Sequence, residues 1–123
     1  MDQVVVIEDL LDTFSEIRYV AIYYQERLVC QQRSQISDSS SGETDKFEEL
    51  LVNPTLLTLA RQRGNIDCGG LQFLIVGYGN FYQLIKEIKG GHISICLQNE
   101  ANLNEIPNKI LTHLENQHPQ LAS

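Results

Sequence analysis

Apolar residues in the first part of the chain recur at helical spacing. Val4, Ile7, Leu10, Leu11 and Phe14 follow one another at intervals of three and four residues, and acidic side chains fall between them. This spacing gathers the apolar side chains on one face of a helix. We therefore expect an amphipathic helix over residues 4–14.

The pattern then changes to that of two strands. Residues 19–24 are β-branched, aromatic or small, and they are apolar on both faces, as in a covered central strand. After a polar turn, residues 28–33 form a second strand that becomes polar toward its end. The two segments predict a hairpin whose second strand lies nearer the edge of the sheet.

The middle of the chain predicts a flexible loop and a broken helix. Residues 34–43 contain five serines around a single isoleucine, too little apolar surface to offset the cost of ordering them. A short helical pattern follows over residues 44–51. Pro54 is expected to interrupt it, and a new helix is expected to begin at Pro54 and end before Gly64.

Three further strands and a final helix complete the pattern. Residues 71–76, 81–88 and 92–97 are apolar segments separated by glycine-containing turns, which predicts an antiparallel meander. Residues 104–118 predict a closing helix capped by Asn104. The order α-β-β-α-β-β-β-α indicates an α+β fold, a five-stranded antiparallel sheet flanked by helices. We expect a single domain over residues 1–118 and a tail at 119–123.

Net charge, the length of apolar stretches and the cysteine pattern exclude several classes of function. The chain has 123 residues, of which 42% are hydrophobic, and a net charge of −7, so nucleic acid is not an expected partner. No apolar stretch approaches the length of a membrane span or a signal peptide, which predicts a cytoplasmic protein without membrane insertion. Cys30, Cys68 and Cys96 form no metal-binding or redox motif and are expected to be reduced, with Cys30 and Cys96 in the core.

The residue pattern contains no catalytic, cofactor or metal signature. The glycines near residues 69 and 77 lack the spacing of phosphate-binding loops and are expected to form turns. His92 and Cys96 share one face of a strand but would lie roughly 13 Å apart, too far for a dyad. His113 and His118 are expected to face solvent.

Other polar residues are likewise expected to be structural. The paired acids at positions 8–9 and 48–49 are predicted to lie on solvated helix faces. The tyrosines at positions 23, 24, 78 and 82 are expected to pack on the sheet with their hydroxyl tips in water. We therefore expect no catalytic residue, cofactor or metal ion.

The complete order of elements resembles the roadblock family of dynein light chain-like domains, within the wider longin and profilin-like group. The matching segments cover residues 4–115: a first helix at 7–14, strands at 19–24 and 28–33, a hairpin at 73–85, a strand at 93–97, an Asn-rich loop at 99–104 and a closing helix. The match consists of apolar positions and turns. The central helix of the family is generally continuous, so the expected break at Pro54 and the long serine-rich loop are departures from it.

The resemblance implies a non-enzymatic domain that homodimerises and acts as an adaptor or regulator of a small Ras-like GTPase. The family pairs the edge strand after the central helix with its twin. Here the implied interface comprises Leu71, Phe73 and Ile75 of that strand, with Leu56 and Leu59 of the central helix. The alternative is a PAS-like or profilin-like sensor that holds a small molecule between sheet and helices. An enzyme ranks third and would need a reactive thiol.

Overall fold

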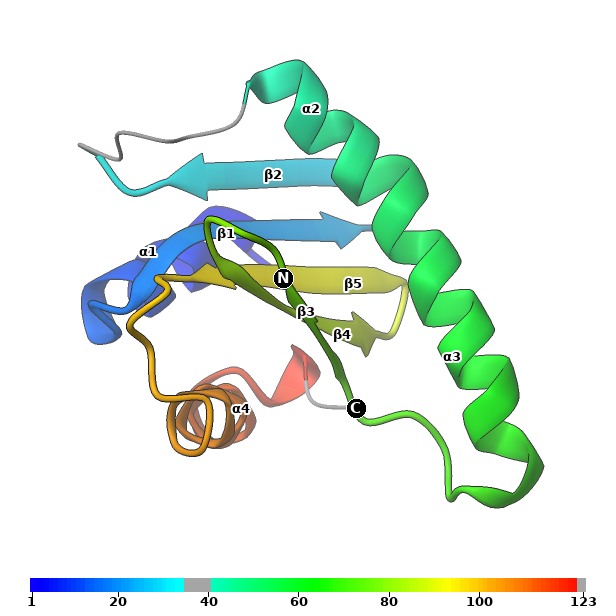
Figure 1. Ribbon diagram of the computed structural model, residues 1–123. Helices are drawn as coiled ribbons and strands as arrows, with labels where there is room; N and C mark the ends of the chain where they lie inside the picture. Colours follow the sequence, from blue (N-terminus) through cyan, green and yellow to red (C-terminus); the bar gives the residue numbers. More distant parts are fainter. Residues whose placement is uncertain (35–40, 122–123) are drawn as a thin grey trace.

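The computed structural model describes residues 1–34 and 41–121, and it confirms the α+β fold class (Figure 1). The chain forms a five-stranded antiparallel sheet flanked by helices. In chain order the elements are α1 (Gln3–Thr13), β1 (Ile17–Tyr24), β2 (Arg27–Gln32), α2 (Gly42–Phe47), the π-helical turn η1 (Glu48–Val52), α3 (Asn53–Asp67), β3 (Leu74–Gly77), β4 (Tyr82–Ile88), β5 (Gly91–Leu97), α4 (Ile106–Gln117) and the 3-10 turn η2 (Pro119–Leu121). Most of the predicted loop at 34–43 lies outside the described residues.

The strands lie in the order β2-β1-β5-β4-β3. The predicted hairpin of β1 and β2 and the predicted meander of β3, β4 and β5 are both confirmed. Pairing of β1 with β5 joins the two units, and it places β1 in the interior of the sheet and β2 at one edge. β3 forms the other edge, beginning at Leu74 and not at Leu71 as predicted.

Helices α1 and α4 cover one face of the sheet and make the main core with it. The buried apolar residues of this layer come from α1, α4, η2, β1, β4 and β5. They include Ile7 and Leu10 of α1 and Ile110 and Leu114 of α4, each no more than 1% exposed. Gln3 joins α1 to the first hairpin, because its Nε2 donates to the carbonyls of Ile22 and Arg27.

A single helical run, Gly42–Asp67, crosses the other face of the sheet, and we call it the long helix (Figure 1). The expected break at Pro54 is therefore wrong, and the helix also extends beyond Gly64 to Asp67. Proline lacks the N–H that an interior α-helical position would use. Here the π-helical turn just before it widens the helix, with the Asn53 N–H donating to the carbonyl of Glu48, and Pro54 occupies the first turn of α3.

The packed domain continues past position 118. Leu121, in η2, is fully buried and belongs to the main core, so at least residues 119–121 are part of the domain and not of a tail. Asn104 does not cap the last helix, whose N-cap position is occupied by Glu105. Within the described part of the chain, no helix has the length and apolar character needed to cross a membrane.

Candidate functional site

The sheet face beneath the long helix is unusually polar. Along β5, apolar residues that enter the main core alternate with His92, Ser94 and Cys96, which face the long helix. All three are buried. Because successive side chains of a strand point to opposite faces, one strand supplies both an apolar and a polar layer.

An irregularity in β1 places Arg18 and Tyr19 on this polar face. Ile17 pairs with Leu97 and Tyr19 with Cys96, so Arg18 is an extra residue in β1. An extra residue of this kind redirects the side chains around it. Arg18 is only 4% exposed; its guanidinium lies 5.2 Å from the centre of the Phe81 ring and donates to the carbonyl of Asn80 at 3.1 Å.

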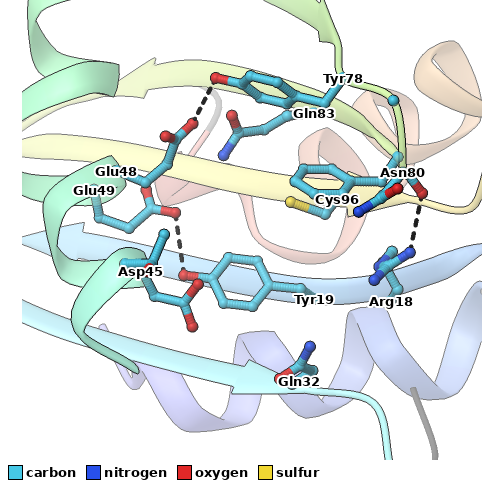
Figure 2. A pocket seen from close by; sticks show the side chains of 13 residues that line it. Arg18, Tyr19, Gln32, Asp45, Glu48, Glu49, Tyr78, Asn80, Gln83 and Cys96 are labelled. Carbon is cyan, nitrogen blue, oxygen red and sulfur yellow. Dashed lines mark hydrogen bonds between the residues drawn. The ribbon is translucent and has the colours of Figure 1, made fainter. Parts of the chain in front are cut away.

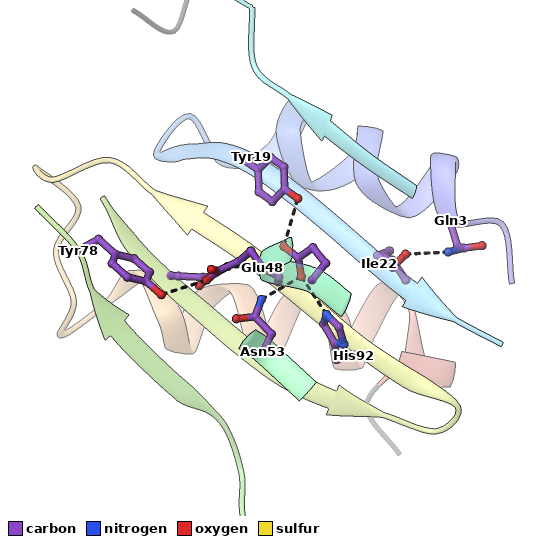
Figure 3. Close-up of polar contacts among 10 residues, drawn as sticks. Gln3, Tyr19, Ile22, Glu48, Asn53, Tyr78 and His92 are labelled. Atoms are coloured by element: carbon purple, nitrogen blue, oxygen red, sulfur yellow. Dashed lines mark hydrogen bonds and ion pairs between the residues drawn. The ribbon is translucent and has the colours of Figure 1, made fainter. Parts of the chain in front are cut away.

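Glu49 is the centre of a group of buried polar contacts, which we call the Glu49 cluster: Glu49, Tyr19, Asn53 and His92. Figure 3 labels the three partners, Tyr19, Asn53 and His92. The carboxylate is fully buried. It accepts hydrogen bonds from the Tyr19 hydroxyl at 3.1 Å and from Asn53 Nδ2 at 2.9 Å, and it lies 2.9 Å from His92 Nε2. Such pairing is what allows an acidic side chain to be buried at all.

The cluster also determines the state of Tyr19. Burial raises the pKa of the Tyr19 hydroxyl far above its ordinary value, and the Glu49 carboxylate raises it further. The hydroxyl therefore stays protonated and acts as a donor to Glu49. The contacts of Glu49 thus connect η1 of the long helix to strands β1 and β5.

A cavity of about 360 Å³ lies beside this cluster, between the start of the long helix and the β3–β4 turn (Figure 2). We call it the α2 cavity. Its volume falls within the range typical of small-molecule sites. Its walls are formed by Arg18, Tyr19, Gln32, Thr44, Asp45, Glu48, Glu49, Tyr78, Gly79, Asn80, Phe81, Gln83 and Cys96.

One side of the α2 cavity is acidic. Burial raises the pKa of the Glu48 carboxyl, the hydrogen bond from the Tyr78 hydroxyl opposes this rise, and the charges of Glu49 and Asp45 add to it. Burial and the neighbouring Glu48 carboxylate raise the pKa of Tyr78 to about 12. The tyrosine hydroxyl therefore remains a donor to Glu48, at 3.1 Å.

One buried polar atom in the cavity wall has no partner among the described residues. Gln83 is 1% exposed, and its Nε2 donates to the Ser94 hydroxyl at 2.7 Å, but its Oε1 accepts no hydrogen bond. A buried acceptor without a donor is unfavourable by about 1–3 kcal/mol. Together with the carboxylates, it makes the cavity rich in acceptors and suited to a ligand that carries N–H or O–H donors.

The thiol in this cavity does not favour nucleophilic chemistry. Burial and the nearby charges of Glu49 and Glu48 raise the pKa of Cys96 well above its ordinary value. A protonated thiol is a poor nucleophile. Cys96 is buried as predicted, whereas Cys30, which was also expected in the core, is exposed.

Several expectations about polar residues are wrong. Glu49 was expected on a solvated helix face, and His92 was considered only as a partner for Cys96; the structure buries both side chains and joins them. The alternation of polar and apolar residues in β5 is the one local signal that could have indicated a buried polar layer. Two of the three partners of Glu49, Tyr19 and His92, lie 30 and 43 positions away in β1 and β5, which no local pattern encodes.

The two histidines of the C-terminal region also differ from expectation. The side chains of His113 and His118 are only 20% and 12% exposed, so neither faces solvent. Both direct Nε2 at the same oxygen of Asp9 in α1. The structure thus brings together residues from opposite ends of the chain that the sequence did not connect.

The residues of the implied dimer interface lie in α3 and in or just before β3. Ile75 in β3 and Leu59 in α3 are exposed, at 36% and 60%. Leu71, Phe73 and Leu56 are half-buried, and Phe73 packs against the main core. Leu71 and Phe73 precede β3.

No protein-family model matches this chain, and a search of curated proteins found no match either.

Proposed function

We propose that this protein is a non-enzymatic interaction module that forms a homodimer by pairing β3 with β3 of a second copy. The observation that carries the proposal is the character of the two sheet edges. β2 contains Arg27 and ends in two glutamines, whereas β3 has the sequence LIVG, without a charged residue. Natural proteins protect open edges with charges or by pairing. An uncharged edge with Ile75 exposed is therefore the edge that favours a partner strand.

The outer surface of the long helix supports the same assembly. Phe47, Leu50, Leu51 and Leu59 are each more than half exposed. Leu50, Leu51 and Leu59 also border a shallow hollow with Pro54. A sheet continued across β3 would bring the long helix of one copy toward the long helix of the other. This would cover apolar side chains that are exposed to water in the single chain.

The oligomeric state in solution tests this proposal. Light scattering coupled to size exclusion is expected to give a dimer for the wild type and a monomer for Ile75→Asp. The matched control is Gln31→Asp, which places the same charge on the exposed opposite edge strand β2 and should leave the dimer intact. Circular dichroism verifies that both variants fold. A wild type that is monomeric at high micromolar concentration contradicts the dimer, and a dimeric Ile75→Asp contradicts the β3 interface.

The resemblance to the roadblock family extends the proposal to a small Ras-like GTPase as the partner of the dimer. A pull-down from the source cell, with the wild type and with Ile75→Asp, tests this extension. Recovery of such a GTPase by the wild type, and weaker recovery by the variant, is the expected result. Absence of any GTPase from the wild-type sample contradicts it.

A second candidate function is binding of a small molecule in the α2 cavity. The specific observation that favours it is the buried, unpartnered Oε1 of Gln83 in the wall of a cavity of about 360 Å³. Native mass spectrometry of the freshly purified protein is the direct assay. A retained adduct that is lost in Gln83→Leu supports this function. An adduct-free wild type, or an adduct that Gln83→Leu keeps, contradicts it.

A further inference from the structure

Three side chains on the α1–α4 side of the sheet converge on one point. Asp9 lies in α1, His113 lies in α4, and His118 follows the end of α4. Asp9 Oδ2 is 2.7 Å from His113 Nε2 and 2.6 Å from His118 Nε2. One ligand atom from each residue lies within 4.8 Å of the other two.

The local structure holds each of these side chains in place. The other carboxylate oxygen of Asp9 accepts a hydrogen bond from the Thr13 hydroxyl at 3.2 Å. The ring of His113 packs edge-on against Phe14, with 5.4 Å between ring centres. Supporting contacts of this kind orient the ligands in metal sites.

The backbone fixes His118 in the same way. Its N–H donates to the carbonyl of Leu114, and its own carbonyl accepts from the N–H of Leu121. Leu114 and Leu121 are no more than 1% exposed. Their burial in the core therefore positions the histidine beside α1.

If the three side chains only form hydrogen bonds, a single oxygen atom must accept from both histidines. A carboxylate oxygen only accepts, so both imidazoles must direct an N–H at the same atom. Without those two protons, each of the three atoms presents a lone pair to a common point. Two imidazole nitrogens and one carboxylate oxygen are a donor set that suits zinc and similar transition metals and not Mg²⁺ or Ca²⁺.

The spacing is close to what a zinc ion requires. Bond lengths of about 2.0–2.1 Å in a tetrahedral site put ligand atoms roughly 3.3 Å apart. The observed N–O separations of 2.7 and 2.6 Å would need to open by only a fraction of an ångström. Rotation of the two rings and of the carboxylate can supply such a change.

We propose that Asp9, His113 and His118 form a binding site for a divalent transition-metal ion of the zinc type. Three protein ligands leave one coordination position for water. The ion joins α1 to the C-terminal end of α4, elements more than one hundred positions apart in the chain. The site lies on the sheet face opposite the Glu49 cluster and is independent of the proposed dimer.

Exposed thiols are the main competing ligands, so the experiment uses the full chain with Cys30→Ser and Cys68→Ser, both exposed positions. The protein is treated with EDTA, dialysed and titrated with ZnCl₂ in a calorimeter, with MgCl₂ as the comparison ion. We expect one zinc ion per chain with a dissociation constant in the micromolar range or below. We also expect an increased melting temperature with zinc and no binding of magnesium.

Variants assign the ligands. His113→Ala and His118→Ala should each weaken zinc binding at least tenfold, whereas Asp12→Ala, an exposed carboxylate on the same helix, should leave it unchanged. Circular dichroism confirms that the variants fold. Absence of zinc binding at 1 mM overturns the proposal, as does binding that both histidine variants retain.

Histidine NMR spectra provide a second readout that needs no substitution. The chain has three histidines, and His92 is buried in the Glu49 cluster on the other sheet face. Zinc should shift the imidazole signals of His113 and His118 and leave that of His92 in place. Unchanged signals of His113 and His118 in the presence of bound zinc would overturn the assignment of these ligands.

Discussion

Replacement of Glu49 by alanine should cost this protein a large part of its folding stability. The Glu49 carboxylate is fully buried and contacts Tyr19, Asn53 and His92. Alanine removes the common partner of all three. Their side chains lie in a buried layer beneath the long helix (Figure 3).

The magnitude follows from the number and type of contacts. A hydrogen bond to a charged group contributes about 1.5–3 kcal/mol, and contacts that share one carboxylate are not additive. The variant also leaves the buried Tyr19 hydroxyl and Asn53 Nδ2 without their acceptor, which costs about 1–3 kcal/mol for each group. We expect Glu49→Ala to lose about 3–5 kcal/mol. Glu49→Gln keeps an oxygen that can accept from Asn53 and His92, so it should lose less, about 1–2 kcal/mol.

Urea unfolding followed by circular dichroism measures these changes. With a slope of about 1–3 kcal/mol per molar urea, the midpoint of Glu49→Ala should fall by roughly 2 M. The control Glu115→Ala, on the exposed side of α4, should remain within about 0.5 kcal/mol of the wild type. A Glu49→Ala variant within about 1 kcal/mol of the wild type would contradict the expected loss of stability. A Glu49→Gln variant with the same urea midpoint as Glu49→Ala would also contradict it.

Three further predictions concern Gly91, Glu48 and Cys96. A Cβ added at Gly91 would lie 1.7 Å from the carbonyl oxygen of Tyr23, so Gly91→Ala should destabilise the fold by more than about 2 kcal/mol. Gly79→Ala, where a Cβ meets nothing within 4 Å, is the control in the same urea assay. The pKa of Glu48 is raised above its ordinary 4.5 in the folded state, so its ionisation lowers stability as pH rises through the folded pKa. Glu48→Gln should therefore raise the urea midpoint at pH 7, and the difference should vanish below pH 4.5; a gain of equal size at low pH would contradict this. Of the three cysteines, buried Cys96 should react last with a thiol reagent, measured by peptide mass spectrometry of the native protein, and early labelling would contradict its raised pKa.

Local sequence patterns were sufficient for most of the secondary structure. Apolar spacing in α1, and the apolar runs of β1 and β5, depend only on residues within one or two turns of helix or one strand. The same is true of glycine-containing turns. The break expected at Pro54 is wrong because the π-helical turn that precedes this proline accommodates it within a continuous helical run.

The candidate sites, in contrast, could not be predicted from local sequence patterns. In isolation, Glu49 is one of two adjacent acids on a helix, and only the packing of the long helix across the sheet places it beside Tyr19 and His92. Asp9 meets His118 over a separation of 109 positions.

Hydrophobic periodicity is a property of neighbouring residues, so it predicted the order of helices and strands correctly apart from the break at Pro54. Which polar side chains are buried, and which of them meet, depends instead on how the elements pack. Their partners come from distant segments, and the stacking of helices on both faces of the sheet sets those distances.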